Sequence, residues 1–161
     1  MILSQTSATK KLHRMALEIA ERNAGKPAII IIGIKDNGLI IANEIAKLLT
    51  PIFAGTINTI ALSIYKKNPK EISLSENIDL KDKLILLIDD VANSGRTMLY
   101  ALAPLLVHNP SQIETLALVE RTYKTFPVAL NYVGLSVSTT ADEHIEVLVE
   151  NGAVLGAKIK A

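Results

Sequence analysis

The 161-residue chain contains no cysteine, no tryptophan and only three histidines, His13, His108 and His144. The lack of cysteine is compatible with any redox compartment, and three scattered histidines argue against a zinc site. No apolar run approaches the roughly 20 residues that cross a membrane, and no charged amino-terminal segment precedes a signal-type apolar core. We therefore expect a cytoplasmic protein without a membrane partner.

Aromatic residues are also few, at 4% of the chain, and the formal net charge is only +1. The core must then be aliphatic, and a mean hydropathy of +0.31 suggests that some apolar surface is buried between subunits of a homodimer or a higher homo-oligomer. A near-neutral chain has no overall electrostatic attraction to nucleic acid. With 49% hydrophobic residues, the length fits a single domain over residues 1–161.

Apolar periodicity predicts alternating helices and strands. Helices are expected over 7–23, with Ser7 or Thr9 as the cap and Gly25 as the stop, over 39–49, and from Thr97 onward. Strands are expected over 28–32, 56–65, 84–88 and 113–119, with shorter extended pieces over 132–137, 145–149 and 154–159. The polar segment 66–81 is expected to be a mobile loop or a short pair of extended arms. This order indicates an α/β domain with a doubly wound parallel sheet and helices on both faces.

The most informative segment is Leu84–Thr97, where an apolar run leads into Asp89 and Asp90 and then into a turn containing Ser94 and Gly95. Ligands bind at the carboxyl ends of strands in open α/β sheets. The amides at the start of the following helix form an anion site, and neighbouring aspartates need a partner such as Mg²⁺ or sugar hydroxyls. Carboxylates for hydroxyls and amides for phosphate together indicate ribose 5-phosphate as the ligand.

Other phosphate-binding motifs fit this chain poorly. Gly33 and Gly38 have the spacing of a P-loop, but Leu39 and Ile40 stand where Lys and Ser or Thr are needed. A phosphoacceptor receiver domain would carry its acidic pair after the first strand rather than past mid-chain. An acidic pair that only ends a strand and caps a helix is the remaining structural alternative.

The full string resembles the phosphoribosyl pyrophosphate (PRPP) signature of type I phosphoribosyltransferases. That resemblance implies a sheet with a small hood of extended segments, Asp89 and Asp90 as catalytic residues, and Mg²⁺ bound mainly through the substrate with these aspartates as candidate ligands. The expected 5-phosphate loop consists of Val91, Ala92, Asn93, Ser94, Gly95, Arg96 and Thr97.

Two further loops are expected to serve the pyrophosphate. Lys35, Asp36, Asn37 and Gly38 leave a buried strand and enter a helix, in the position of the family's pyrophosphate loop, and Lys35 is the candidate catalytic cation. Lys66 and Lys67 stand at the base of segment 66–81, where closure would exclude water. Solvated surface lysines are the alternative at both places.

A narrower resemblance, to the pyrimidine operon regulators with uracil phosphoribosyltransferase activity, rests on segments 117–127 and 131–135, residues 19–25 and the Gly33-Ile34-Lys35 loop. It implies that the nucleobase is bordered by Val119, Arg121, Thr122 and Tyr123. Asn93 stands where 6-oxopurine enzymes carry an aspartate, and an amide cannot take up the purine N7 proton.

These resemblances lead us to expect transfer of ribose 5-phosphate from PRPP to a base, uracil first, giving UMP and pyrophosphate. Asp36-Asn37 and Thr122-Tyr123 depart from the regulators' thr-arg and gly-his pairs. These departures weaken the case for RNA binding. An RNA-binding attenuation regulator, with Lys10, Lys11, His13 and Arg14 as its basic patch, and a non-catalytic PRPP or nucleotide sensor remain the alternatives.

Overall fold

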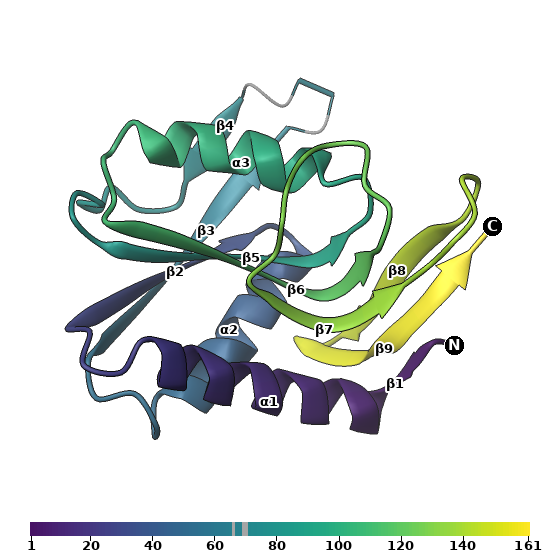
Figure 1. Cartoon of the computed structure of the whole chain (residues 1–161), viewed down its shortest axis with the longest axis horizontal. Helices are drawn as coiled ribbons and strands as arrows, with labels where there is room; N and C mark the ends of the chain where they lie inside the picture. The colour runs from purple at the N-terminus through teal and green to yellow at the C-terminus, as the bar shows by residue number, and fades with distance from the viewer. Residues whose placement is uncertain (66, 69–70) are drawn as a thin grey trace.

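A computed structural model describes residues 1–65, 67–68 and 71–161 as two sheets and three helices (Figure 1). The helices are α1 (Gln5–Arg22), α2 (Asn37–Leu49) and α3 (Arg96–Leu106). The strands are β1 (Leu3–Ser4), β2 (Ala28–Ile34), β3 (Thr56–Ile64), β4 (Ile72–Leu74), β5 (Leu84–Ala92), β6 (Gln112–Arg121), β7 (Tyr132–Val137), β8 (His144–Glu150) and β9 (Ala153–Lys160).

The main sheet has the order β4-β3-β2-β5-β6-β7, and every neighbouring pair is parallel except β3 and β4. Helices α1 and α2 cover one face and α3 covers the other (Figure 1). Because both faces are covered, the central strands are apolar on both sides. Ile29 and Ile31 of β2 pack toward α1 and α2, whereas Ile30 and Ile32 pack toward α3.

The connections leave β2 and β5 in opposite directions. The chain passes from β2 through α2 to β3, and from β5 through α3 to β6 on the other side of the sheet. Pairing between β2 and β5 ends at Gly33 and Ile88, although β5 stays paired with β6 as far as Ala92. The sheet therefore opens between these two strands at their carboxyl ends, the topological switch point where such folds bind ligands.

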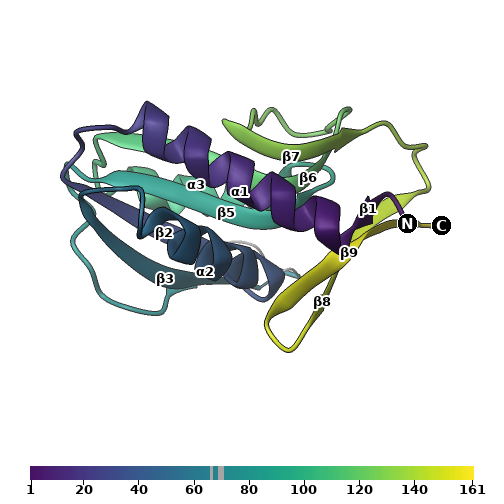
Figure 2. The same cartoon turned by 90° about the horizontal axis from the view of Figure 1, so that it is seen from below.

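A second, antiparallel sheet of order β1-β9-β8 forms a hood at this end of the main sheet (Figure 2). Both termini lie at the hood, where β1 pairs with β9. Ile145 and Val147 of β8 and Val154 and Ala157 of β9 belong to the same apolar cluster as α1 and α2. Apolar packing thus holds the hood against the main domain.

The expected α/β class with a hood is confirmed, with three local differences. Helix α1 begins earlier than expected, because its cap is Ser4, whose Oγ accepts a hydrogen bond from the Ser7 amide. Within segment 66–81, β4 pairs with β3 as an extended arm, and mobility of this segment stays a prediction. Strand β5 continues through Asp89 and Asp90, since β6 pairs with it that far. No helix in the described ranges has the length and apolarity needed to cross a membrane.

Candidate active site

A cavity of about 370 Å³ lies where the sheet opens between β2 and β5. Three segments line it: the end of β2 with the start of α2, the end of β5 with the start of α3, and the middle of β8 in the hood. Its lining residues are Ile34–Asn37, Asp89–Met98 and Ile145–Val147. The cavity therefore unites two loops of the main sheet with an edge strand of the hood.

The two neighbouring aspartates on β5 have different environments. Asp89 is 9% exposed, and its Oδ1 accepts a hydrogen bond of 2.9 Å from the Asp90 amide. Asp90 is half-buried, and its Oδ1 accepts 2.8 Å from the Val91 amide. Its Oδ2 accepts 3.0 Å from Nδ2 of Asn37, across the gap between the two strands. Both residues line the cavity, and carboxylate oxygens are suited to bind hydroxyl groups or a cation.

Helices α2 and α3 both begin at the cavity, and neither N-cap residue makes a side-chain hydrogen bond to its helix. In α3 the Arg96 amide donates to Oγ of Ser94 at 3.2 Å, and the amides that follow it are the ones available to an anion. Asp36 precedes α2 and follows a cis peptide bond from Lys35. Gly95 precedes α3 with a φ of +84°, and a Cβ there would lie 2.7 Å from Cγ1 of Val128, so only glycine fits. Uncapped helix starts present free amides and the positive end of the helix dipole, which makes each one an anion site.

Side-chain charge in the cavity is mainly negative. Among its described lining residues, Lys35 and Arg96 are the two cations, against four acids: Asp36, Asp89, Asp90 and Glu146. A polyanion that binds here must bring positive charge with it. The part of the chain that the structure describes holds no group of three or more His, Cys, Asp or Glu side chains that could bind a metal alone. The donor set therefore fits a divalent cation that shares its ligands with a bound substrate.

Two asparagines connect the hood to the loops of the main sheet. Asn93 donates from Nδ2 to the Ile145 carbonyl at 3.2 Å and accepts on Oδ1 from the Ile145 amide, also at 3.2 Å. Asn37 donates to the Val147 carbonyl at 3.4 Å in addition to its bond with Asp90. Strand β8 thus covers the cavity, bonded through its main chain.

Residues 1–150 match the family model of the phosphoribosyl transferase domain. The chain belongs to the type I phosphoribosyltransferase family. Among curated relatives, the bifunctional protein PyrR of Staphylococcus carnosus is 31% identical over 93% of this chain and 91% of its own length. The bifunctional protein PyrR of Pediococcus pentosaceus is 32% identical over 92% of this chain and 90% of its own length.

Solved phosphoribosyltransferase structures share the fold at low identity. A hypoxanthine-guanine phosphoribosyltransferase from Bacillus anthracis superposes with a TM-score of 0.72 at 18% identity, covering 90% of this chain and 84% of that one. The hypoxanthine phosphoribosyltransferase of Trypanosoma cruzi superposes with a TM-score of 0.78 at 12% identity, covering 86% of this chain and 81% of that one. These similarities establish the architecture and not the base.

Most of the residues predicted to bind phosphate line the cavity. All of Val91–Thr97 line it, as do Lys35, Asp36 and Asn37. Gly38 lies just behind, where a Cβ would be 2.8 Å from the Ile88 carbonyl oxygen. Lys67 is exposed and is not among the lining residues, and Lys66 lies outside the described residues.

The four residues predicted to border the base are not part of the cavity lining. Val119 is fully buried in β6, and the Tyr123 side chain is 77% exposed. Arg121 donates from Nη2 to the Thr140 carbonyl at 2.9 Å, and the hydroxyls of Thr122 and Ser138 are 3.1 Å apart. These contacts tie the end of β6 to β7 and to the segment before β8, so a role toward the base stays a prediction.

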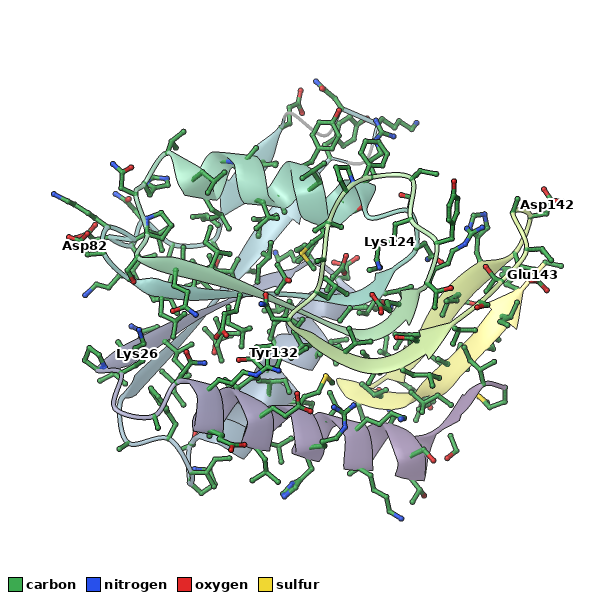
Figure 3. All side chains as sticks on the ribbon, in the orientation of Figure 1. Lys26, Asp82, Lys124, Tyr132, Asp142 and Glu143 are labelled. Atoms are coloured by element: carbon green, nitrogen blue, oxygen red, sulfur yellow. The ribbon has the colours of Figure 1, made fainter. Side chains whose placement is uncertain are left out.

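Sequence reasoning missed the contribution of β8. An extended piece was expected at 145–149, but nothing in its sequence indicated that Ile145, Glu146 and Val147 would reach the cavity. Lys124 lies in the loop after β6 (Figure 3), pairs with Glu120 at 2.7 Å, and is not among the residues that line the cavity. That loop covers the phosphate loop, because the Thr125 and Phe126 amides both donate to the Ser94 carbonyl.

Proposed function

We propose that this phosphoribosyltransferase moves ribose 5-phosphate from PRPP to uracil, releasing pyrophosphate and forming UMP. The observation that carries this proposal is the meeting of two uncapped helix starts with Asp89 and Asp90 in one cavity. PRPP carries a phosphate at C5 and a pyrophosphate at C1, on opposite sides of its ribose. The cavity offers two anion sites, one at each helix start, beside an acidic pair.

Each phosphate group is assigned to one helix start. The loop Ala92–Thr97 at α3 binds the 5-phosphate through amides, and the side chain of Arg96 is available beside it. The start of α2 with Lys35 binds the pyrophosphate, whose leaving is favoured by a nearby cation. The family requires little covalent chemistry of the protein, so the protein acts mainly by placing its substrates.

The acidic pair binds the ribose. In this reaction the bond from ribose C1 to the pyrophosphate oxygen breaks, the bond from C1 to uracil N1 forms, and the N1 proton is released. Positive charge develops on the sugar ring as the first bond breaks. Asp89 and Asp90 accept hydrogen bonds from the ribose hydroxyls and stabilise that charge electrostatically, and Asn37 holds Asp90 in place for this role.

The proposed cofactor is Mg²⁺. Bound together with pyrophosphate, Mg²⁺ would neutralise the leaving group, and Asp89 and Asp90 are the side chains available to complete its ligand set. Four acids against two cations in the described lining support this assignment, because PRPP without a metal would be repelled.

Uracil is the proposed acceptor on chemical grounds. The side chain of Asn93 accepts from and donates to Ile145, and as an amide it cannot take up a proton from a purine N7. Curated relatives along nearly the whole chain are called bifunctional protein PyrR. The predicted base contacts of Arg121 and Tyr123 are not needed for this assignment.

The test is pyrophosphate release from PRPP and Mg²⁺ with uracil, cytosine, adenine, hypoxanthine or guanine offered separately. We expect release with uracil above the others, and a loss of about 10²–10³-fold in kcat for Asp90→Asn, the range for removal of a preorganised electrostatic group. Asp142→Asn, at the exposed tip before β8 (Figure 3), is the matched control and should keep wild-type turnover. Wild-type turnover in Asp90→Asn, or preference for a purine, would contradict the proposal.

A second candidate function is regulation by RNA binding, favoured by the bifunctional relatives and by the exposed Lys10 and His13 on α1. Arg14 of the same face is already engaged with the Val133 and Gly134 carbonyls, at 2.8 and 3.1 Å. A structured leader RNA should then bind with affinity that falls steeply with salt, and Lys10→Ala should weaken it. Equal affinity for a scrambled RNA would eliminate this candidate.

A further inference from the structure

The exposed edge of β8 is where the hood faces the cavity. Strand β8 is the outer strand of the β1-β9-β8 sheet, so among the strands of residues 1–65, 67–68 and 71–161 it pairs with β9 alone. Successive residues on an antiparallel strand point their main-chain groups alternately toward and away from the partner. Ile145 bonds Asn93 through both its amide and its carbonyl, so it points away from β9, and Val147, two residues on, points the same way.

Asn93 hydrogen-bonds the main-chain groups on this edge of β8, as a neighbouring strand would. Its side-chain amide exchanges two hydrogen bonds with one residue, which is the pattern of a hydrogen-bonded pair in an antiparallel sheet. Asn93 belongs to the proposed 5-phosphate loop, so this pair connects the hood directly to the part of the site that binds phosphate.

Asn37 makes a parallel connection from the other side of the cavity. Its Nδ2 is 3.0 Å from Oδ2 of Asp90 and 3.4 Å from the Val147 carbonyl. One amide group thus joins the first residue of α2, the acidic pair and the hood. The two asparagines bond residues 145 and 147, on the same edge of β8.

We propose that Asn93 and Asn37 are positioning residues that set the distance and orientation of β8 over the cavity. Through this position they set the affinity for the acceptor base, a consequence that rests on the proposed function. Neither residue touches the reacting atoms in this role. We call the bonds of Asn93 and Asn37 to residues 145 and 147 the hood latch.

Apolar packing alone does not supply this positioning. The side chains of Ile145 and Val147 are 4% and 3% exposed and keep the hood attached to the core. Apolar contact is not directional, whereas a two-bond amide pair fixes both distance and angle. Loss of the hood latch should therefore leave the protein folded but allow the β8 edge to move.

The hood latch should affect the acceptor base more than PRPP. The loop Ala92–Thr97 is proposed to bind the 5-phosphate through main-chain amides, and alanine at position 93 keeps its amide. The acceptor base is proposed to enter between this loop and the edge of β8 that the Asn93 side chain bonds. Disruption of the Asn93 pair should therefore raise the KM for the base by a larger factor than the KM for PRPP.

The first arm of the test measures amide hydrogen exchange at Ile145 by NMR in the ligand-free protein. In Asn93→Ala we expect exchange at Ile145 to become roughly tenfold faster or more, as expected for removal of two neutral hydrogen bonds. Asn58→Ala, on the exposed side of β3, is the control and should leave Ile145 unchanged. If Asn93→Ala does not fold, Asn93→Leu replaces it, since it keeps the size of the side chain and can neither donate to nor accept from Ile145. Wild-type exchange in the folded variant would overturn the latch.

The second arm measures steady-state kinetics. In Asn93→Ala we expect the KM for the base to rise roughly tenfold, a larger factor than any rise in the KM for PRPP. A fall in kcat with an unchanged KM for the base would overturn the positioning role. If the wild-type protein transfers ribose phosphate to no base, the proposed function fails and the exchange arm alone decides the latch.

Discussion

Replacement of Gly38 by alanine tests how the main sheet and α2 are fitted together at the site. Gly38 is the second residue of α2, and in an isolated helix Gly→Ala would stabilise by up to about 1 kcal/mol. In this protein the new Cβ would lie 2.8 Å from the Ile88 carbonyl oxygen and 3.1 Å from Cα of Asp89. Both are main-chain atoms of β5 and cannot move aside cheaply.

The structure therefore predicts the opposite sign from local propensity. Insertion of a methyl group into a closely packed place costs typically about 1–3 kcal/mol, so the net change in the free energy of unfolding should be a loss of about 1–2 kcal/mol. The start of α2 would also be displaced from Asp89, and we expect the KM for PRPP to rise because Lys35–Asn37 move with it.

Urea denaturation followed by far-ultraviolet circular dichroism gives the free energy of unfolding, and the midpoint should fall at an unchanged m-value. Asn43→Ala is the matched control, since it introduces the same side chain at an exposed position of the same helix and should stabilise by about 0.5 kcal/mol. The argument from close approach would be refuted if Gly38→Ala were as stable as the wild type or more stable.

Three other outcomes follow from contacts at and away from the cavity. Tyr132→Phe should lower the free energy of unfolding by about 1.5–3 kcal/mol in urea, because Tyr132 (Figure 3) is fully buried and its hydroxyl donates to Glu114 at 2.7 Å. Tyr65→Phe, at an exposed position, should leave the free energy of unfolding unchanged. Burial and the Glu114 carboxylate raise the pKa of Tyr132 above its ordinary value. The contribution of Tyr132 to the free energy of unfolding should therefore be constant below about pH 10 and fall above it, as the tyrosine ionises in the unfolded chain. The fall above about pH 10 should be smaller in Tyr132→Phe than in wild type. Lys35→Ala should raise the KM for PRPP roughly tenfold in steady-state assays, and an unchanged KM would remove Lys35 from the pyrophosphate site.

Predictions of the elements of the main sheet succeeded where burial and periodicity agreed. The isoleucine run of β2 and the Leu84–Ile88 run of β5 could only be strands covered on both faces, and both lie at the centre of the sheet. The start of α1 was misplaced, because Ser4, Ser7 and Thr9 are all acceptable caps by residue type. Only the pairing of β1 with β9 decides which of them begins the helix.

The hood was the least predictable part of the site. Asn93 and Ile145 are 52 residues apart in the chain, and neither residue type indicates that the two are in contact. The base-site prediction for Val119–Tyr123 depended on family resemblance alone, and in the structure these residues lie outside the cavity lining.

Local sequence patterns are enough to predict the alternation of strands and helices, the two acidic residues near the end of a buried strand, and the two loops that enter helices. These features depend on apolar periodicity and on turn residues. The opening of the sheet between β2 and β5, the meeting of both helix starts at one cavity, and the cover that β8 provides are properties of the tertiary structure. Those arrangements depend on strand order and on main-chain hydrogen bonds between distant segments, which leave no periodic trace in a single sequence.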